Sequence, residues 1–545
     1  MTNRVVITAA VGLWAVALSL GVARPARAVG AAADLRPGAT HAVVFASAPL
    51  SRYAAFVGSP ETLVTTYRVV PKTPAPASSP TSAPTPAAAA EREPLEPSEE
   101  TTYRRGALYH EIGRGAGVSV ESGFNGHSYW SSNENRYVVT ALEDAARRAI
   151  TSNALDSGGV IPEGTATREM GSETVDGTPA DIVRVTPPGG MSADLAIDHA
   201  TGALRRIVFD PEDRYRHATV HIIDYKEIAP GVRVPAHFRF GNGPQHELVR
   251  GAVQAVSDAE LAAPSPSSAW AFGNGDSVPI QVQRGTRIGR RVIVRASING
   301  HPGDFLLDSG AGLILLYQPY ARSLGLSMLG RTSYSGVAGG VNTARFARAE
   351  TIAVGDNTLS NVVVAVSERD PSDKAPYDGI LGFDLLAGAL VHVDLVKGAV
   401  TFGDPTQFQP TIEKGAYAFP VNLADNTPEV LVKIGNYTTR ATIDTGDDHF
   451  ATLSDNLITS GRLVSLPLGT IYFTGVDGIT PEPATCYKLN EISVGPYRYQ
   501  GASVCLAKEA VFGKDGGLIG FDFLRHFNWT FDYTRSHVVM TPNGQ

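Results

Sequence analysis

Cysteine, charge and familiar metal-binding motifs are scarce in this 545-residue sequence. Its 2 cysteines are too few for a disulfide-rich scaffold or a four-cysteine zinc site. Charged residues make up 18% of the chain, below the roughly 25% of a typical globular protein, and the net charge is −8. These values argue against a coiled coil, a highly charged disordered chain, and a nucleic-acid-binding protein, which would carry a basic face.

The short motifs of common metal and dinucleotide sites are also missing. There is no His-Glu-x-x-His and no Cys-x-x-Cys. The glycine-rich segment Gly113–Gly117 is not followed by the helix that a dinucleotide site needs. His110-Glu111 has no partner at metal-ligand spacing. We therefore expect no metal and no cofactor.

The longest apolar run lies at the start of the chain. Val5–Val22 follows Arg4 and precedes an Ala-x-Ala site at Ala26–Ala28. This pattern is typical of a cleaved secretory signal peptide over residues 1–28. A membrane anchor is the alternative, because the run is near the spanning length. We favour the signal peptide because the cleavage site follows directly, and we expect a periplasmic or secreted protein with no stable membrane anchor after cleavage.

The remaining sequence predicts about three domains at roughly 100–200 residues each. Residues 71–100 contain eight prolines and no aromatic residue, which is typical of a flexible insertion. From 103 to 245 the pattern is mostly β, with one clear helix predicted over 140–150. A Pro/Ser stretch at 263–268 marks a boundary. We therefore expect a β-rich accessory domain over residues 40–262.

Several turns of this region carry a family resemblance. They are Asn125-Gly126 with Tyr129-Trp130, Ile197–Gly202, and Asp224–Pro235. Together they resemble the LolA-like half-barrel of periplasmic lipoprotein carriers. The resemblance implies a curved antiparallel sheet wrapped on helices, whose concavity takes an apolar ligand. A generic β-rich accessory domain remains the alternative.

A repeat occupies the C-terminal half. Phe305–Gly310 reads Phe-Leu-Leu-Asp-Ser-Gly, and Ala441–Gly446 reads Ala-Thr-Ile-Asp-Thr-Gly. Downstream, Asp378–Leu386 parallels Gly516–Leu524, and both run into a strand. The two aspartates are 136 residues apart and the two glycine motifs are 138 apart. Two motifs in the same order at nearly equal spacing indicate two copies of one unit, which we name repeat 1 (residues 275–405) and repeat 2 (residues 413–545).

The repeated motifs resemble those of aspartic peptidases of the retropepsin-like type. The resemblance implies two mainly β barrel lobes that form a pepsin-like pseudo-dimer, with Asp308 and Asp444 as the catalytic pair. Two carboxyls about 3 Å apart share one proton, so one activates a water and the other polarises the scissile carbonyl. The loops around the pair would be supported by Ser309, Gly310, Thr445 and Gly446, and buttressed from behind by Gly379, Gly382, Gly517 and Gly520.

Glycine-rich stretches between the motifs fit the flaps that cover the cleft of such enzymes. They contain Gly336, Gly339 and Gly340 in repeat 1, and Gly475 and Gly478 in repeat 2. Simple hairpin turns are the alternative for each stretch.

Repeat 2 departs from the family pattern. Asp447 stands where a small residue is usual, and Asp448 follows it. Extra carboxylates near the pair favour protonation, which puts the competence of repeat 2 in doubt. Cys486 and Cys505 lie in strand-like runs and are candidates for one disulfide in an oxidising compartment; two buried free thiols are the alternative.

The leading hypothesis is an exported, mainly β aspartic endopeptidase that acts on peptide or protein substrates. We expect a monomer with an intramolecular pseudo-dimer and no nucleic-acid partner. The rival is a non-catalytic periplasmic protein that binds peptides or lipids through degenerate protease lobes. In a third hypothesis only repeat 1 is catalytic, and it pairs with repeat 1 of another chain.

Overall fold

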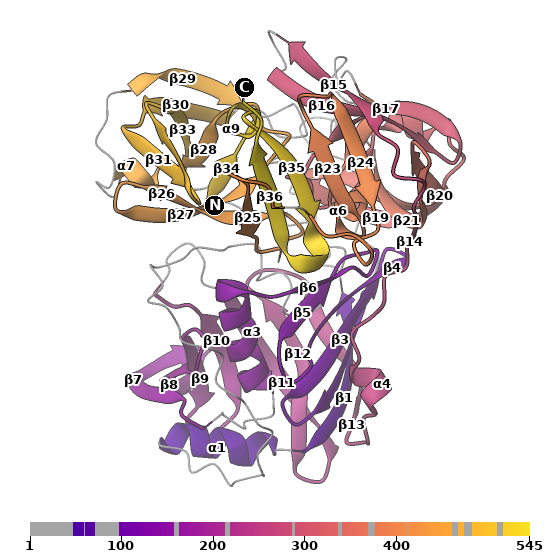
Figure 1. The fold of residues 1–545 in the computed structure, drawn as a ribbon. Helices are drawn as coiled ribbons and strands as arrows, with labels where there is room; N and C mark the ends of the chain where they lie inside the picture. Colours follow the sequence, from indigo (N-terminus) through magenta and orange to yellow (C-terminus); the bar gives the residue numbers. More distant parts are fainter. Residues whose placement is uncertain are drawn as a thin grey trace, which may run out of the picture.

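The computed structural model describes residues 47–58, 60–70, 98–156, 163–212, 218–285, 289–335, 341–368, 377–410, 412–423, 425–459, 467–473, 482–508 and 516–544. These residues are mainly β and form three sheets (Figure 1). The expected signal peptide and the candidate flap glycines of both repeats lie outside the described residues. Among the described residues, no helix is both long and apolar enough to cross a membrane.

The first sheet forms the N-terminal part of the molecule (described residues 47–262). Its strand order is β6-β5-β4-β3-β2-β1-β13-β12-β11-β10-β9-β8-β7. The strands are β1 (Thr62–Val70), β2 (Ser98–Arg105), β3 (Leu108–Gly115), β4 (Val118–Phe124), β5 (Tyr129–Ser132), β6 (Val138–Thr140), β7 (Ala166–Val175), β8 (Thr178–Thr186), β9 (Ala193–Asp198), β10 (Leu204–Phe209), β11 (Ala218–Ala229), β12 (Val232–Phe240) and β13 (Gln245–Ala252).

This sheet curves around helices (Figure 1). Helix α1 (Ala48–Val57) begins after Ser47, whose hydroxyl caps the first turn, and it packs on β8, β9 and β12. Helices α3 (Glu143–Asp156) and α4 (Asp258–Leu261) complete this part. Its apolar core joins Leu50 of α1 to strand residues such as Leu195 and Phe238, so the sheet and its helices bury one shared face.

The proline-rich segment connects two neighbouring strands. β1 and β2 pair in antiparallel register from Thr62↔Arg105 to Val69↔Ser98. The predicted insertion over residues 71–100 is therefore too long by three residues, because Ser98–Glu100 belong to β2. Pairing with β1 stabilises those residues although their sequence alone is polar.

The second sheet contains most of repeat 1 and both ends of repeat 2. Its order is β19-β20-β21-β18-β22-β17-β16-β15-β24-β23-β35-β36-β25, and β14 pairs with β21. The elements are β14 (Ala269–Ala271), β15 (Val278–Gly285), β16 (Gly289–Ile298), β17 (His301–Leu307), β18 (Leu315–Leu316), α5 (Gln318–Ala321), β19 (Ser327–Ser335), β20 (Val341–Val354), β21 (Asn357–Ser367), β22 (Gly379–Leu381), α6 (Phe383–Ala387), β23 (Leu390–Asp394), β24 (Ala399–Gly403), β25 (Tyr417–Pro420), β35 (Phe527–Asp532), the 3₁₀ helix η2 (Tyr533–Arg535) and β36 (His537–Pro542).

The third sheet contains the rest of repeat 2, in the order β29-β30-β33-β28-β34-β27-β26-β31-β32. The elements are β26 (Glu429–Ile434), β27 (Tyr437–Ile443), β28 (Ala451–Ser454), α7 (Asn456–Thr459), β29 (Pro467–Phe473), β30 (Glu482–Lys488), β31 (Glu491–Val494), β32 (Tyr497–Gln500), β33 (Ser503–Ala507), β34 (Gly517–Ile519) and α9 (Phe521–Leu524). In β26, buried Val430, Val432 and Ile434 alternate with exposed Leu431 and Lys433, as expected where one face of a strand meets the core.

The strand pairings of repeat 1 recur in repeat 2. In repeat 1, β17 pairs in parallel with β22, β22 pairs antiparallel with β18, and β18 pairs in parallel with β21. In repeat 2, β27, β34, β28 and β33 pair in the same sequence of directions. The two aspartate motifs therefore follow equivalent strands, β17 and β27.

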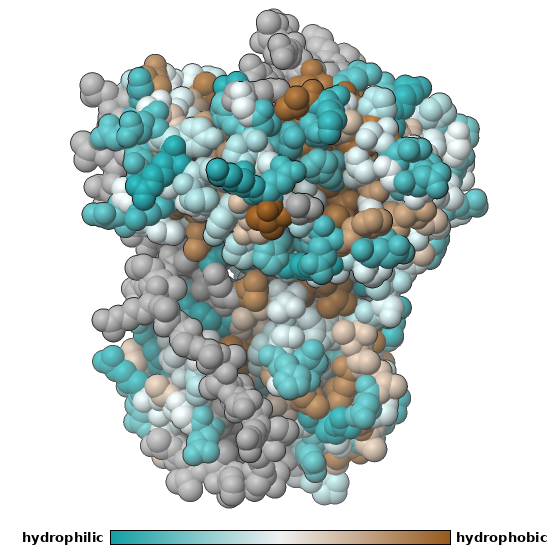
Figure 2. Space-filling view, viewed as in Figure 1, coloured by the Kyte–Doolittle hydropathy of each residue, from teal (hydrophilic) through white to brown (hydrophobic). Residues whose placement is uncertain are grey.

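The two repeats are joined by a shared sheet and a shared core. β23 of repeat 1 pairs antiparallel with β35 of repeat 2, from Leu390↔Asp532 to Val393↔Trp529. One apolar cluster contains Phe383 and Phe402 together with Phe521 and Trp529. The space-filling view shows several hydrophobic residues where the N-terminal part meets the repeats (Figure 2).

The two cysteines lie opposite each other in repeat 2. Cys486 of β30 pairs in register with Cys505 of β33, and a disulfide joins them. Both side chains are buried in a small cluster with Ala484 and Ala507. The bridge joins β30 to β33, and Cys505 is also the register partner of Thr452 on β28.

Candidate active site

Two strand ends deliver the aspartates to one place. Asp308 follows β17, and its backbone N–H donates to the carbonyl of Leu381 at 3.1 Å. Asp444 follows β27, and its backbone N–H donates to the carbonyl of Ile519 at 2.9 Å. The parallel neighbours β22 and β34 therefore extend their pairing to the aspartates themselves and fix where each loop begins.

Ser309 and Thr445 tie the two loops together. The Ser309 hydroxyl donates to the carbonyl of Ile443 at 2.6 Å and accepts from the Thr445 N–H at 3.1 Å. The Thr445 hydroxyl donates to the carbonyl of Leu307 at 2.8 Å and accepts from the Ser309 N–H at 3.0 Å. Both side chains are 1% exposed. Four reciprocal hydrogen bonds in a dry interface hold the loops face to face.

The glycines after them leave space for the opposite carboxyl. A Cβ atom on Gly310 would lie 2.5 Å from Oδ1 of Asp444, and one on Gly446 would lie 2.6 Å from Oδ2 of Asp308. Neither glycine has a positive φ, so these positions require glycine for lack of room and not for backbone conformation. The Gly310 and Gly446 N–H groups donate to Oδ1 of their own aspartates at 2.8 and 2.7 Å.

The two carboxyls hydrogen-bond to each other and titrate as a pair. Burial raises the pKa of Asp308 above its ordinary value. Burial raises the pKa of Asp444 well above its ordinary value, and the charges of Asp308 and Asp447 raise it further. Because two adjacent carboxyls cannot both ionise cheaply, the pair retains one proton to higher pH than isolated aspartates do.

The later glycine motifs lie directly behind the loops. A side chain on Gly382 would overlap the carbonyls of Ala311 and Leu313, and one on Gly379 would overlap that of Leu315. In repeat 2, a side chain on Gly520 would overlap the carbonyls of His449 and Asp447, and one on Gly517 would overlap Leu453. Close backbone approach therefore requires glycine at all four positions.

Asp447 is paired with His449, a residue that no sequence motif marks. Nδ1 of His449 lies 2.8 Å from Oδ1 of Asp447, and the Thr452 hydroxyl donates to Oδ2 at 3.2 Å. Burial alone would lower the pKa of His449, but its hydrogen bond to Asp447 and the surrounding acidic charges raise it. The extra carboxylate thus has its own partners, although its charge still acts on Asp444.

Among the described residues, the same segment contains a group of side chains with the spacing of metal ligands. Asp447, Asp448 and His449 bring one potential ligand atom each within 4.8 Å of one another. Nδ1 of His449 already contacts both carboxylates, at 2.8 and 3.4 Å. Ion pairing within the segment accounts for this arrangement, and we assign it no cofactor.

Aromatic and basic groups that no motif marks surround Asp308. The rings of Tyr317 and Tyr377 stack with centroids 5.9 Å apart. Burial raises the pKa of both phenols, and the charge of Asp308 adds to the effect. The charge of Arg291 favours ionised Asp308. These residues come from three separate segments, so only the fold brings them together.

Thr445→Val should weaken the attachment between the Asp308 and Asp444 loops while keeping the volume of the side chain. Valine has the volume of threonine but no hydroxyl, so the Ser309 N–H and the Leu307 carbonyl lose a buried partner, at about 1–3 kcal/mol each. We expect a lower free energy of unfolding and lower peptidase activity, whereas Thr445→Ser should retain both. Denaturant unfolding and peptide cleavage measure this. Thr438→Val, half-buried on β27, is the control; an equal effect there would contradict the role of the hydroxyl.

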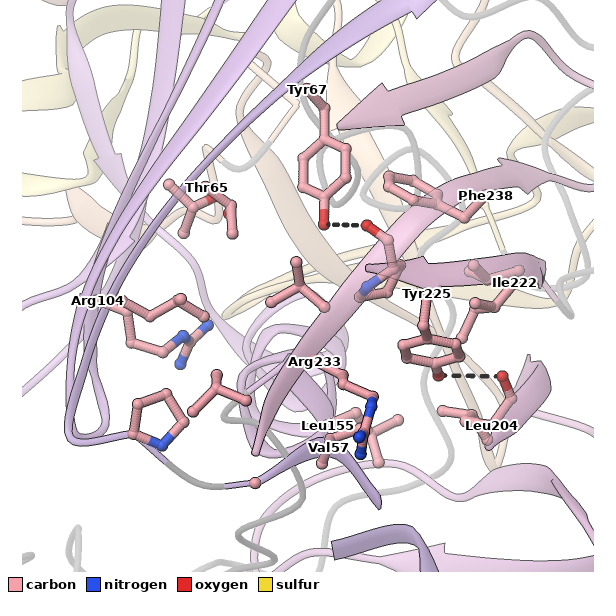
Figure 3. Close-up of a pocket in the computed structure, with 18 of the residues that line it drawn as sticks. Val57, Thr65, Tyr67, Arg104, Leu155, Leu204, Ile222, Tyr225, Arg233 and Phe238 are labelled. Carbon is pink, nitrogen blue, oxygen red and sulfur yellow. Dashed lines mark hydrogen bonds between the residues drawn. The ribbon is translucent and has the colours of Figure 1, made fainter. Parts of the chain in front are cut away.

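A separate cavity lies between the curved sheet and the helices of the N-terminal part (Figure 3). Its lining is mostly apolar, with Val57, Leu155, Leu204, Ile222 and Phe238 among the labelled residues. Tyr67 and Tyr225 also line it, and their hydroxyls donate to the carbonyls of Pro235 and Leu204 at 3.0 Å. Arg104 lines the wall, where it hydrogen-bonds Asn153 at 2.5 Å. The N-terminal part thus contains a mainly apolar cavity whose tyrosine hydroxyls already have hydrogen-bond partners.

Residues 294–385 match the family model described as aspartyl protease. The match contains Asp308, Ser309 and Gly310 together with Gly379 and Gly382. No curated protein matches the sequence. Residues 294–385 therefore form an aspartyl protease-like domain.

Proposed function

We propose that the chain is an aspartic endopeptidase that hydrolyses peptide bonds with a water held between Asp308 and Asp444, one from each repeat. The reciprocal hydrogen bonds of Ser309 and Thr445 are the observation that carries this proposal. They bring a second carboxyl, 136 residues away in sequence, against the aspartate of the protease-like domain.

The chemistry follows from one proton shared by two carboxyls. The ionised carboxyl takes a proton from the water as it attacks the peptide carbonyl carbon. The protonated carboxyl donates a hydrogen bond to the carbonyl oxygen and later supplies the proton that the leaving amine needs. The raised pKa of both groups supports retention of that shared proton. The geometry leaves the two roles exchangeable.

The proposal extends to substrate, location and assembly. An extended peptide or protein segment would lie across the interface of the two repeats, covered by flaps that contain the candidate glycines. The apolar run before Ala26–Ala28 supports export to the periplasm or outside the cell. The shared β23–β35 pairing supports a monomer that carries both aspartates.

Cleavage of a mixed peptide library tests the activity. We expect internal peptide bonds to be cut, and we expect a statine-type inhibitor, whose hydroxyl mimics the attacked carbonyl, to block cleavage. Mass spectrometry of the products with and without inhibitor provides the measurement. Absence of both cleavage and inhibitor binding at every pH would favour the binding-protein alternative.

The pH profile of kcat should be bell-shaped and displaced toward neutral pH. Activity requires one proton on the pair, so it falls at low pH when both carboxyls are protonated and at high pH when both are ionised. Because the pKa of each aspartate is raised, both limbs should lie above those of an unperturbed aspartate pair. Initial rates between about pH 2 and 9 measure the limbs; a rate that keeps rising with pH would contradict a shared proton.

We also propose an apolar ligand for the N-terminal cavity. Its apolar lining and the hydrogen-bonded tyrosine hydroxyls support a ligand that is held mainly by burial. Such binding would coexist with peptidase activity, because the cavity belongs to a different sheet from the aspartates.

A further inference from the structure

A buried acid lies directly behind the Asp308 loop. Asp384 of α6 is 1% exposed, and its Oδ2 accepts a hydrogen bond from the backbone N–H of Ile314 at 3.3 Å. Phe383, the residue before Asp384, also contacts this loop, because its backbone N–H donates to the carbonyl of Ala311 at 2.9 Å. A carboxylate buried to this extent needs further donors to remain stable.

Those donors come from the N-terminal part. The turn between β5 and β6 places Nδ2 of Asn133 at 2.6 Å and Nδ2 of Asn135 at 2.9 Å from Oδ1 of Asp384. Asn135 also exchanges two hydrogen bonds with the backbone of Val363, at 2.9 and 2.7 Å. Both asparagines are at most 2% exposed. Two neutral amides thus solvate the charge on a residue about 250 positions away.

The turn between β5 and β6 is also stabilised by hydrogen bonds of its own. Oδ1 of Asn133 accepts from the N–H groups of Asn135 and Tyr137 at 3.1 and 3.0 Å. The Tyr137 ring meets Phe383 edge to face, with centroids 6.4 Å apart. Figure 1 shows β5 and β6 at the end of the first sheet that faces α6. The Asn133 amide is therefore held by the backbone of its own turn, and the Asn135 amide is held by the backbone of Val363.

Repeat 2 supplies an internal comparison. Asp522 occupies the same place in the second glycine motif, and its side chain is 49% exposed and 3.4 Å from Arg525. Asp384 and Asp522 follow the same Gly-Phe sequence, yet only Asp384 is enclosed by the N-terminal part. Burial raises the pKa of Asp384 to about 6, and the two asparagine hydrogen bonds oppose that rise.

We propose that Asn133 and Asn135 are positioning residues for the catalytic loop: through Asp384 they hold the segment from Asp308 to Ile314 in its productive geometry. The N-terminal part is then an integral support of the active site as well as an accessory unit. This inference rests on the proposed peptidase function for its kinetic consequence, but its structural consequence is independent of activity.

Asn133→Asp in the full-length chain tests the proposal. Aspartate keeps the Oδ1 acceptor that shapes the turn, but it places a second carboxyl where the amide lies 2.6 Å from Oδ1 of Asp384. The two carboxyls must then repel or share a proton, and in either case Asp384 loses its neutral amide donor. We expect kcat for peptide cleavage to fall by about 10- to 100-fold, since small displacements of reacting groups have effects of this size, while KM changes little. We also expect faster hydrogen–deuterium exchange at the amide of Ile314.

Asn125→Asp is the matched control. Oδ1 of Asn125 likewise accepts from two turn N–H groups, those of His127 and Ser128 at 3.0 and 2.9 Å, at an exposed turn. It should leave kcat and the Ile314 exchange unchanged. Should Asn133→Asp fail to fold, Asn133→Ser keeps an acceptor for the turn without adding a charge, and the same two readouts apply.

The outcomes separate the two proposals. A folded Asn133 variant with wild-type kcat and wild-type exchange at Ile314 would overturn the positioning role, as would a lower unfolding temperature with unchanged kcat per folded molecule. If the wild-type protein cleaves no peptide, the proposed function fails, and the exchange rate at Ile314 alone decides whether the asparagines hold the loop.

Discussion

Asp308→Asn and Asp444→Asn are each expected to lower kcat for peptide cleavage by at least about 100- to 10,000-fold, the contribution of a positioned general acid or base. Asparagine keeps the shape of the side chain but can neither accept the proton of the attacking water nor deliver one to the leaving amine. Because both aspartates have raised pKa values, the neutral amide also removes repulsion within the pair. The variants should therefore remain folded at neutral pH, with an unfolding temperature at or above that of the wild type.

Three outcomes distinguish the hypotheses. Loss of cleavage in both variants, with Asp276→Asn unaffected at an exposed position, supports one intramolecular pair. Loss in Asp308→Asn alone would instead support pairing of repeat 1 with another chain. Normal cleavage by both variants would rule out the aspartate pair. The same initial-rate assay and a thermal melt decide among them.

Gly310→Ala should have an effect of similar size for a steric reason. The added methyl would lie 2.5 Å from Oδ1 of Asp444, closer than any real contact permits, so the Asp444 carboxyl must turn away or the two loops must separate. Overpacking of this kind costs about 1–3 kcal/mol of stability, and a displacement of about 1 Å lowers the rate about 100-fold. Gly446→Ala, which would meet Asp308 at 2.6 Å, should behave alike. Cleavage assays and denaturant unfolding provide both numbers.

Gly312→Ala is the comparison for this prediction. A Cβ there would meet ordinary contacts at 3.4 Å from the Asp425 carbonyl and 3.5 Å from Cβ of Asn426. It should cause a much smaller loss in both measurements, although it lies in the same loop. Equal losses at positions 310 and 312 would mean that loop flexibility, and not room for the opposite carboxyl, explains the glycines.

The sequence allowed a prediction of the mainly β fold and of the two aspartate motifs because both depend on local patterns. Alternating apolar residues predict strands, and two motifs that recur in the same order can be recognised within a single sequence. The helix expected over 140–150 begins only at Glu143 and continues to Asp156, because Val138–Thr140 pair with β5. The pairing of β5 with β6 thus determines where the helix begins, and local helix propensity cannot predict that pairing.

Contacts between distant segments were beyond sequence reasoning. Nothing near Asn133 or Asn135 in the sequence points to Asp384, and His449 becomes informative only when its ring is seen against Asp447. The disposition of Tyr317, Tyr377 and Arg291 around Asp308 likewise depends on three chain segments. The flap glycines, the signal peptide and the export of the chain remain predictions.

Both copies of the aspartate motif lie in one polypeptide, and the pairing of β23 with β35 joins them in one sheet. In a homodimer every substitution appears twice, at positions related by the symmetry axis. Here each copy is a separate stretch of sequence, so a substitution in one leaves the other unchanged. In repeat 1, Asp384 accepts a hydrogen bond from Asn133 of another sheet. In repeat 2, His449 and Asp447 form an ion pair beside the Asp444 loop. One half of the proposed catalytic pair can thus be supported by another sheet while the other half has different charges beside its loop.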